Sequence, residues 1–211
     1  MPERLPRRGL YAITPDGLSG ARLLSSVEAA LAGGVRLIQY RDKGHDPVQR
    51  FRDATGLAER CRLYGACFII NDDIELAIRV AADGVHLGRD DAAIGEARAH
   101  LAPGSVIGAS CYADLARASH ALAAGADYLA FGAVCTSRTK PDATPVTLPL
   151  LREAASRFTV PIAAIGGIDL ARASDVLATG VSLLAVCDDL FSADDVREQA
   201  RRYTRLFQGP I

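Results

Sequence analysis

The sequence QYRDK at positions 39–43 places two cations beside an amide at the end of a short apolar run, 36–41. If this run is a strand, Gln39, Arg41 and Lys43 project to the same side, because side chains alternate along a strand. Arginine offers phosphate oxygens a planar fork of donors, and lysine offers a compact charge. The segment therefore predicts an anion site, and a solvated, charged strand end remains the alternative.

Acidic residues follow the next two apolar runs. Asp72 follows the run 67–71, and Asp91 follows the run 84–88 after two further residues. Carboxylates are hard oxygen ligands, and Mg²⁺ typically takes one or two of them together with phosphate oxygens. Asp72 and Asp91 are the natural pair for such an ion. The alternative for any single aspartate, such as Asp73, is that it caps the following helix.

Other polar groups also follow apolar runs. Ser110 offers a small hydroxyl, the segment TSRTK at 136–140 combines hydroxyls with cations that suit an anion, and the pair Gly166-Gly167 lets backbone amides approach a ligand. Each has a structural alternative, which is a cap or turn for Ser110, a plain polar loop for 136–140 and a tight turn for the glycines. His86 is expected to be a packed, hydrogen-bonded histidine rather than a ligand.

These positions need a fold that brings the ends of many strands together. The apolar runs are nearly continuous, which favours strands buried on both faces of a parallel sheet. They alternate with amphipathic segments such as 47–64, 113–124 and 148–158. The predicted strands are 9–14, 36–41, 67–71, 84–88, 106–110, 128–132, 161–167 and 183–187.

Eight such repeats predict an α/β fold, a single (β/α)8 TIM barrel whose one catalytic domain spans residues 1–211. In this fold chemistry gathers at the carboxyl ends of the strands. An open doubly wound sheet is the rival fold, but the segment 14–20 lacks its glycine fingerprint. An Ala–Gly phrase recurs at 32–35, 81–85, 124–127 and 178–181, where glycine is expected to end a helix in a tight turn.

Composition narrows the class of protein. The net charge of −1 gives no general attraction to nucleic acid or to an anionic membrane, so any anionic ligand must be held by local charges. The partners considered are small-molecule substrates and a second copy of the chain in a homo-oligomer. The five cysteines are odd in number and lack CxxC spacing, which argues against a disulfide framework or a zinc site. Met1–Arg8 does not resemble a signal peptide, and we expect a cytoplasmic protein.

Several motifs together resemble the thiamine phosphate synthase family along nearly the whole chain. They occur in the family's order and at similar spacing. The motifs are GLYAITPD (9–16), QYRDK (39–43), NDDIELA (71–77), DGVHLGRDD (83–91), IGASCY (107–112), ADYLAFG (126–132), SRTKPDA (137–143) and AIGGI (164–168).

The resemblance implies a transferase that joins hydroxymethylpyrimidine diphosphate to a thiazole phosphate, giving thiamine monophosphate and diphosphate. It implies Mg²⁺ bound by Asp72 and Asp91, and catalytic roles for Arg41, Lys43 and Lys140. The residues expected on the pyrimidine diphosphate are Gln39, Arg41, Lys43, Asn71, Ser110 and Lys140. Those expected on the thiazole phosphate are Ser137, Arg138, Thr139, Gly167, Cys187 and Asp188.

The chain departs from the family after its last strand. Cys187-Asp188 stands where an apolar residue and a serine are commoner, and the added carboxylate predicts weaker phosphate binding unless backbone amides hold the anion. Asp188 and Asp189 are expected to cap the last helix or to face away. The alternatives in function are a thiazole tautomerase, a non-catalytic thiazole- or thiamine-phosphate binding barrel, and a generic phosphate-binding barrel.

Overall fold

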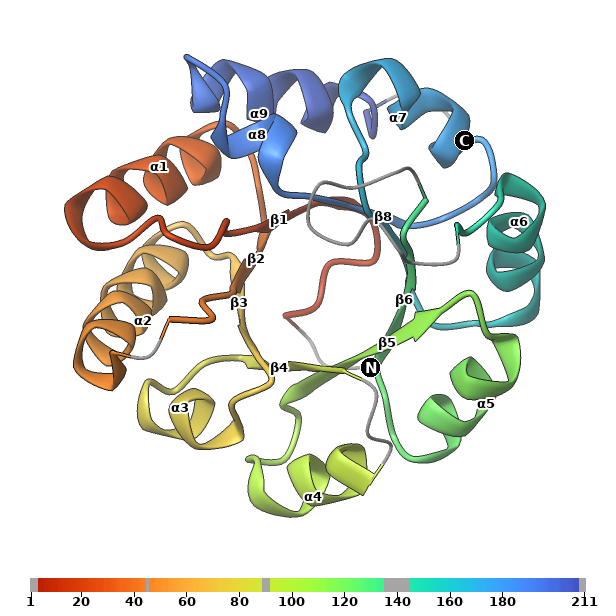
Figure 1. The fold of residues 1–211 in the computed structure, drawn as a ribbon, viewed down its shortest axis with the longest axis horizontal. Helices are drawn as coiled ribbons and strands as arrows, with labels where there is room; N and C mark the ends of the chain where they lie inside the picture. The colour runs from red at the N-terminus through yellow and green to blue at the C-terminus, as the bar shows by residue number, and fades with distance from the viewer. Residues whose placement is uncertain (1–3, 45, 89–91, 135–144, 209–211) are drawn as a thin grey trace.

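A computed structural model describes residues 4–44, 46–88, 92–134 and 145–208. Eight parallel strands pair in sequence order and close into a barrel, with β1 against β8 (Figure 1). The (β/α)8 TIM barrel predicted from the sequence is thus confirmed. The strands are β1 (Gly9–Ile13), β2 (Leu37–Tyr40), β3 (Cys67–Asn71), β4 (Gly84–Leu87), β5 (Val106–Tyr112), β6 (Tyr128–Gly132), β7 (Ile162–Ile165) and β8 (Leu183–Val186).

Helices surround the barrel, and each strand is followed by a helix, with β8 followed by two (Figure 1). Six of them begin at a side chain that accepts backbone N–H groups, which are Asp46, Asp73, Asp114, Thr147, Asp169 and Asp195. The helices are α1 (Gly20–Ala32), α2 (Pro47–Leu63), α3 (Ile74–Arg79), α4 (Ala92–His100), α5 (Leu115–Ala123), α6 (Leu148–Arg157), α7 (Leu170–Leu177), α8 (Asp188–Phe191) and α9 (Val196–Arg205).

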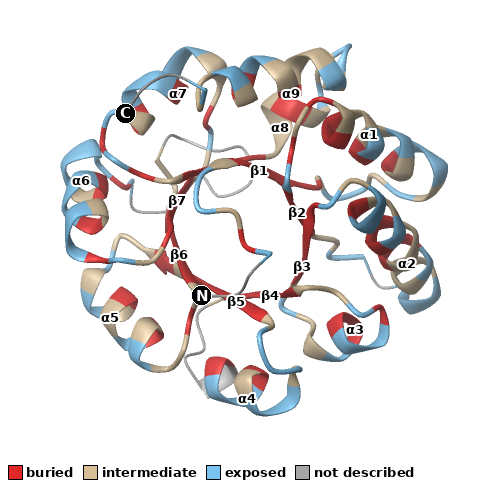
Figure 2. Cartoon of the chain, turned by 180° about the vertical axis from the view of Figure 1, so that it is seen from behind, coloured by how far each residue is buried: buried red, intermediate tan, exposed pale blue. Residues whose placement is uncertain are grey.

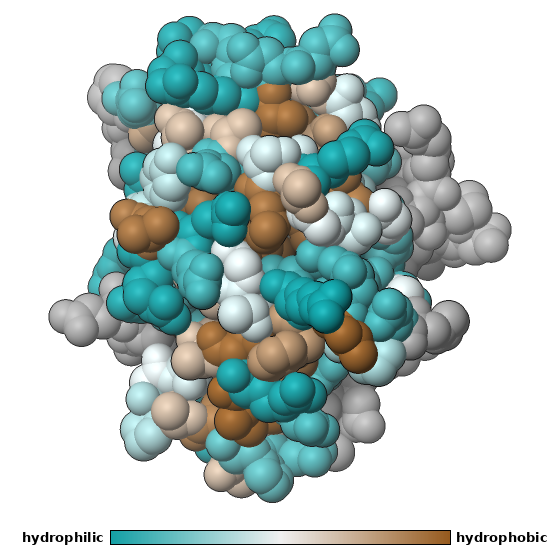
Figure 3. All heavy atoms as spheres, turned by 90° about the vertical axis from the view of Figure 1, so that its left-hand side faces the viewer, coloured by the Kyte–Doolittle hydropathy of each residue, from teal (hydrophilic) through white to brown (hydrophobic). Residues whose placement is uncertain are grey.

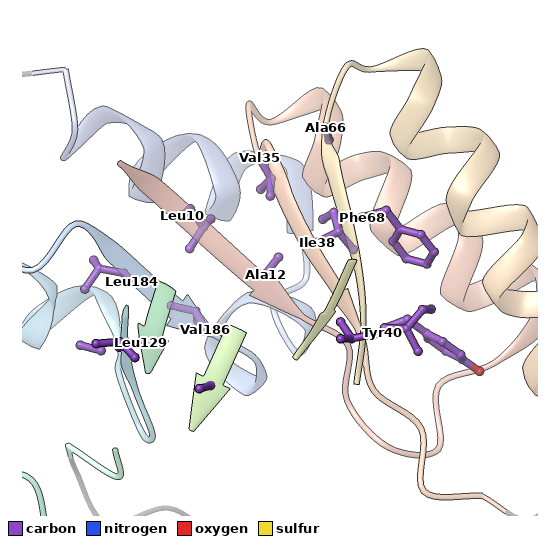
Figure 4. Packing of buried hydrophobic residues seen from close by; sticks show 14 of the residues in the cluster. Leu10, Ala12, Val35, Ile38, Tyr40, Ala66, Phe68, Leu129, Leu184 and Val186 are labelled. Atoms are coloured by element: carbon purple, nitrogen blue, oxygen red, sulfur yellow. The ribbon is translucent and has the colours of Figure 1, made fainter. Parts of the chain in front are cut away.

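Two apolar layers follow from the alternation of side chains along the strands. Outward-facing residues pack against the helices, and Figure 4 shows Leu10, Ile38 and Phe68 from neighbouring strands in this outer layer. Inward-facing residues such as Leu37 and Ile69 fill the barrel. The strands are therefore buried on both faces, while the helices bury only their inner side (Figure 2).

The amino-terminal segment crosses one opening of the barrel before it enters β1 (Figure 1). Its Leu5 is buried in the inner apolar layer, and Arg4 pairs with Asp83 at 3.0 Å, just before β4. This opening is therefore the one at the amino ends of the strands. The carboxyl ends, where the sequence places its polar residues, lie at the opposite opening.

The recurring turn phrase behaves as predicted at three of its four places. The turns of Gly34, Gly125 and Gly180 each use a positive φ. At 81–85 the prediction is wrong, because Ala81 takes the positive φ of 50° and Gly84 is the first residue of β4. Position 84 requires a glycine for steric reasons, because a Cβ there would lie 1.9 Å from the Val106 carbonyl oxygen.

β2 ends one residue earlier than predicted. The Thr14 hydroxyl accepts a hydrogen bond from Arg41 N at 2.9 Å and donates to Arg41 O at 3.1 Å, so a side chain replaces the ladder partner there. β5 extends two residues further than predicted, to Tyr112, through an irregular register. Strand alternation therefore stops before Lys43, which is exposed.

The outer surface carries scattered apolar side chains. Figure 3 shows the face that bears α1, α2 and α3, where hydrophilic residues predominate and apolar ones are interspersed. Val48, Leu63 and Ile78 are among the exposed large apolar residues. No helix in the described part of the chain is both long and apolar enough to cross a membrane.

Candidate active site

A cavity of about 710 Å³ opens at the carboxyl ends of the strands. All eight strands contribute to its wall, through Ile13, Gln39, Asn71, His86, Ser110, Ala130, Ile165 and Ala185. Tyr112 at the end of β5, Asp188 at the start of α8 and loop residues that include Arg41, Gly167 and Cys187 complete it. Seven of the residues chosen from the sequence therefore converge on one cavity at the end of the barrel where this fold places its chemistry; they are Gln39, Arg41, Asn71, Ser110, Gly167, Cys187 and Asp188.

Two predicted residues lie outside the wall of this cavity. Lys43 and Asp72 are exposed and do not contribute to the lining. Five further predicted residues lie outside the described part of the chain, which are Asp91, Ser137, Arg138, Thr139 and Lys140. Their roles stay predictions.

The floor of the cavity is a line of hydrogen-bonded side chains. Gln39 Nε2 donates to the Tyr11 hydroxyl at 2.7 Å, and this hydroxyl lies 2.6 Å from the Tyr128 hydroxyl. His86 reaches Tyr128 through Nδ1 and Ser110 Oγ through Nε2, each at 2.9 Å. His86 is 6% exposed, which confirms the predicted packed, hydrogen-bonded histidine.

The two tyrosines of this line were missed by the sequence reasoning. Tyr11 and Tyr128 lie inside apolar strands and are fully buried, so composition alone makes them core residues. Burial raises the pKa of both hydroxyls well above the ordinary value, since a phenolate would lose its hydration. The sequence offered one indication of their role. Each tyrosine places a hydroxyl at a position that faces the barrel interior, and a buried hydroxyl requires a hydrogen-bond partner.

Arg41 lies at the mouth of the cavity with its own acidic partner. Its guanidinium donates to Asp16, and the backbone N of Lys43 donates to the same carboxylate at 3.2 Å. Thr14 fixes the Arg41 backbone from the neighbouring strand. Asp16 therefore ties the β1 loop to the β2 loop and holds the guanidinium at the rim.

Asp72 has an unusual backbone conformation. Its φ is 61°, its N–H donates to His86 O at 2.9 Å, and Asn71 Nδ2 donates to its carboxylate at 2.8 Å. A Cβ built on Gly88 would lie 3.6 Å from this carboxylate, so the ends of β3 and β4 meet there. Asp73 instead caps α3 and pairs with Arg50 at 2.9 Å, which confirms the structural alternative for that residue.

Arg117 of α5 links the ends of β4 and β5. Its guanidinium donates to Ser110 O at 2.8 Å and to Gly88 O at 2.6 Å. It also lies over the Tyr112 ring, at 5.8 Å from the centroid. Arg117 therefore holds the backbone of Ser110 from the side of α5. The sequence did not indicate this contact.

The opposite side of the cavity is built differently, from backbone and one short helix. Gly166 and Gly167 follow β7 with φ values of 103° and 63°. A Cβ on Gly166 would lie 2.6 Å from Ala133, so the β6 and β7 loops approach closely. The sulfur of Cys187 donates to the Asp188 carboxylate at 3.7 Å, and burial raises the pKa of this thiol to about 12.

The two aspartates after β8 form the first turn of α8. The prediction that they cap the last helix or face away is wrong, because Asp195 caps α9 and both aspartates line the cavity. Asp189 instead accepts hydrogen bonds from Tyr203 at 2.6 Å and from Gln199 at 2.7 Å. α9 is thereby tied to the rim through a carboxylate that is already satisfied.

Comparison with known proteins identifies the family. A family model described as thiamine monophosphate synthase matches residues 10–190. The chain belongs to this family. The thiamine-phosphate synthase of Chromobacterium violaceum is 52% identical over 207 residues, covering 98% of this chain and 99% of the relative. That of Thiobacillus denitrificans is 50% identical over 199 residues and covers 94% of both chains.

A solved structure agrees with this membership. The thiamine phosphate pyrophosphorylase from Pyrococcus furiosus superposes with a TM-score of 0.86 at 36% identity, over 96% of both chains. The family predicted from the sequence motifs and the enzyme class that goes with it, a transferase, are therefore confirmed. Within this thiamine monophosphate synthase fold, the described residues contain no cluster of three or more metal-ligating His, Cys, Asp or Glu side chains.

Proposed function

We propose that this chain is a thiamine-phosphate synthase that joins hydroxymethylpyrimidine diphosphate to a thiazole phosphate, releasing diphosphate. The observation that carries the proposal is the convergence of Gln39, Arg41, Asn71 and Ser110 on one cavity in a member of this family. The shape suits two bound substrates, and holding both in one enclosed space supplies proximity.

The reaction we propose is a dissociative alkyl transfer. The bond from the pyrimidine methylene to the diphosphate oxygen breaks, and its electron pair leaves with the diphosphate. The thiazole nitrogen then forms the new bond to the methylene carbon. Arg41, together with Lys43 and Lys140, stabilises the charge that develops on the leaving group. The mechanism requires no protein nucleophile.

Mg²⁺ is the proposed cofactor, and Asp72 with Asp91 would hold it. The Asp72 carboxylate fits this role, because it is exposed at the rim and its Asn71 and Gly88 neighbours leave it accessible to a cation. When bound, the ion would neutralise diphosphate charge as a Lewis acid. Asn71, whose amide already orients this carboxylate, would also contact the diphosphate.

The thiazole phosphate would lie on the opposite side, against Gly167, Cys187 and Asp188, with Ser137, Arg138 and Thr139 from the preceding loop. Loops after the seventh and eighth strands are the usual phosphate site of this fold. Glycine at positive φ turns backbone N–H groups toward a ligand without a side chain in the way. Backbone amides are therefore the main donors we propose for this phosphate.

We also propose that the barrel is one catalytic domain over residues 1–211 and that it acts in the cytoplasm. Among the described residues Cys61, Cys67, Cys111 and Cys187 are free thiols, which suits a reducing compartment. A homo-oligomer stays a proposal.

The test is formation of thiamine monophosphate from both substrates, with and without Mg²⁺. We expect product with the ion and none when it is chelated. The double variant Asp72→Ala with Asp91→Ala should lose at least about 100-fold in kcat/KM, since each removed ligand weakens charge stabilisation. Asp175→Ala, which removes an exposed carboxylate on α7, is the matched control.

Full activity of the double variant would overturn the metal assignment. Tight binding of thiamine monophosphate without turnover by the intact chain would instead support the non-catalytic alternative.

A further inference from the structure

Five polar side chains from five strands form one continuous hydrogen-bonded line across the barrel interior. In order they are Gln39 (β2), Tyr11 (β1), Tyr128 (β6), His86 (β4) and Ser110 (β5), joined by distances of 2.7, 2.6, 2.9 and 2.9 Å. Both end residues line the cavity, whereas the two tyrosines are fully buried. The line therefore connects two ligand-facing groups through the protein rather than through solvent.

The line has a direction. The amide nitrogen of Gln39 is not an acceptor, so the Tyr11 hydroxyl accepts from it. Either tyrosine hydroxyl could donate to the other, and we take Tyr11 as the donor because its buried proton needs an acceptor and Tyr128 is its other contact. With Tyr11 as the donor to Tyr128, the Tyr128 proton is left for Nδ1 of His86, which fixes the tautomer of the ring. An imidazole that accepts at Nδ1 carries its proton on Nε2, which donates to Ser110 Oγ.

The direction decides what the two ends offer to the cavity. Because Gln39 uses its nitrogen on Tyr11, its Oε1 is left as an acceptor for a ligand. Because Ser110 Oγ accepts from His86, its own proton is left as a donor. A reversed line would exchange these roles and would need Gln39 to turn its oxygen toward Tyr11.

Packing holds the line in place. The His86 and Tyr128 rings stack with centroids 5.5 Å apart, and the Tyr11 and Tyr128 rings meet edge to face at 5.7 Å. A Cβ on Gly108 would lie 2.0 Å from Cζ of Tyr128, so glycine leaves the space for that ring. Burial raises the pKa of both hydroxyls, so they keep the protons that the line needs.

We infer that Tyr11, Tyr128 and His86 are positioning residues that fix an acceptor at Gln39 and a donor at Ser110, so that the site selects an aminopyrimidine over its 4-oxo counterpart. This inference rests on the proposed function. An aminopyrimidine carries an amino donor and ring-nitrogen acceptors, which match the two ends. The 4-oxo form carries a carbonyl acceptor and a ring N–H donor, and leaves a buried polar group unpaired.

The first arm of the test uses the protein alone. Long-range ¹H–¹⁵N NMR at neutral pH, with His86 assigned by its loss in His86→Asn, reports the imidazole tautomer. We expect a proton on Nε2 and none on Nδ1. A proton on Nδ1, alone or in an imidazolium, would overturn the direction of the line.

The second arm measures selectivity as a ratio of Kd values. Calorimetry with Mg²⁺ and without thiazole phosphate compares the aminopyrimidine diphosphate with its 4-oxo counterpart. We expect the intact protein to prefer the amino form by roughly 100-fold or more, since an unpaired buried group is strongly rejected. Tyr128→Phe should reduce this preference by about tenfold, because the line is cut while the ring is kept.

Tyr11→Phe removes the hydroxyl between Gln39 and Tyr128, and it replaces Tyr128→Phe in the experiment if that variant does not fold. Tyr40→Phe is the matched control, since its hydroxyl donates to Asp42 at 3.3 Å in the outer layer. An unchanged preference in both folded line variants, or an equal loss in Tyr40→Phe, would contradict the inference. If the proposed function is wrong, neither pyrimidine binds and no product forms, while the His86 tautomer still reports on the line.

Discussion

The two sides of the cavity hold their ligand-facing groups by different means. On the side of the proposed pyrimidine site, defined by Gln39, Arg41, Asn71 and Ser110 and called the pyrimidine side, side chains are held by other side chains, and Arg117 holds the Ser110 backbone. On the thiazole side, defined by Gly166, Gly167, Cys187 and Asp188, the backbone provides the shape and a short helix follows at once.

The difference teaches where selectivity resides. A hydrogen-bonded line of buried groups presents donors and acceptors in one fixed order, which suits recognition of a heteroaromatic edge. Backbone N–H groups offer donors of one kind, which suits an anion that is read by charge and shape. In the function we propose, the pyrimidine side therefore discriminates between ligands, and the thiazole side holds a phosphate.

The largest effect should follow from Arg41→Ala. Loss of the guanidinium removes charge stabilisation from the departing diphosphate, and we expect kcat/KM to fall by roughly 100- to 1,000-fold. Steady-state kinetics measure this, with Arg22→Ala on α1 as the control for a lost exposed cation. A decrease in kcat/KM of less than threefold would contradict the proposed role of Arg41 in stabilising the leaving diphosphate.

Gly108→Ala should destabilise the packing of Tyr128 beneath the pyrimidine side. The added methyl group would occupy the place of the Tyr128 ring, and overpacking of this kind costs about 1–3 kcal/mol of the free energy of unfolding. Urea titration measures the loss. Gly95→Ala in α4 meets nothing within 4 Å and should be neutral or stabilising. Equal stability of the two variants would contradict the close packing.

Asp188→Ser should improve binding of the thiazole phosphate on the thiazole side. Removing a carboxylate near a bound phosphate should lower the KM for thiazole phosphate by roughly three- to tenfold, since like charges repel. The KM for the pyrimidine diphosphate should stay within about twofold, because that substrate contacts the other side. A change confined to the pyrimidine KM would reverse our assignment of the two sides.

Cys187 should show the smallest effect. Its pKa is raised to about 12 by burial and by the neighbouring Asp188 carboxylate, so the neutral thiol predominates at neutral and mildly alkaline pH. We expect iodoacetamide at pH 8 to label it much more slowly than free cysteine, as followed by peptide mass spectrometry. Rapid labelling at this one position would mean that the thiolate is accessible.

Much of this comparison could be predicted from the sequence, because strand alternation and apolar runs fix which residues reach the carboxyl ends of a barrel. Gln39 and Ser110 were found by that rule, whereas Asn71 was found through the family resemblance. Tyr11 and Tyr128 were not, because their contact joins strands far apart in sequence and depends on barrel closure. The Arg41–Asp16 pair was missed for the same reason.

Two features of the local backbone geometry could not be predicted from the sequence either. At 81–85 the positive φ is taken by Ala81, while the glycine at 84 is used for its close contact with the Val106 carbonyl. The early end of β2 follows from a threonine on the neighbouring strand. Both are tertiary contacts that override local propensity, and periodicity does not report them.

The unequal sides of the cavity are tested most directly by the kinetics of Tyr128→Phe with each substrate varied in turn. The KM for the pyrimidine diphosphate should rise by roughly fivefold or more, because Gln39 and Ser110 lose their fixed order, while the KM for thiazole phosphate stays within about twofold. Equal increases in both KM values would contradict the division, since the buried line would then support the whole cavity rather than one side.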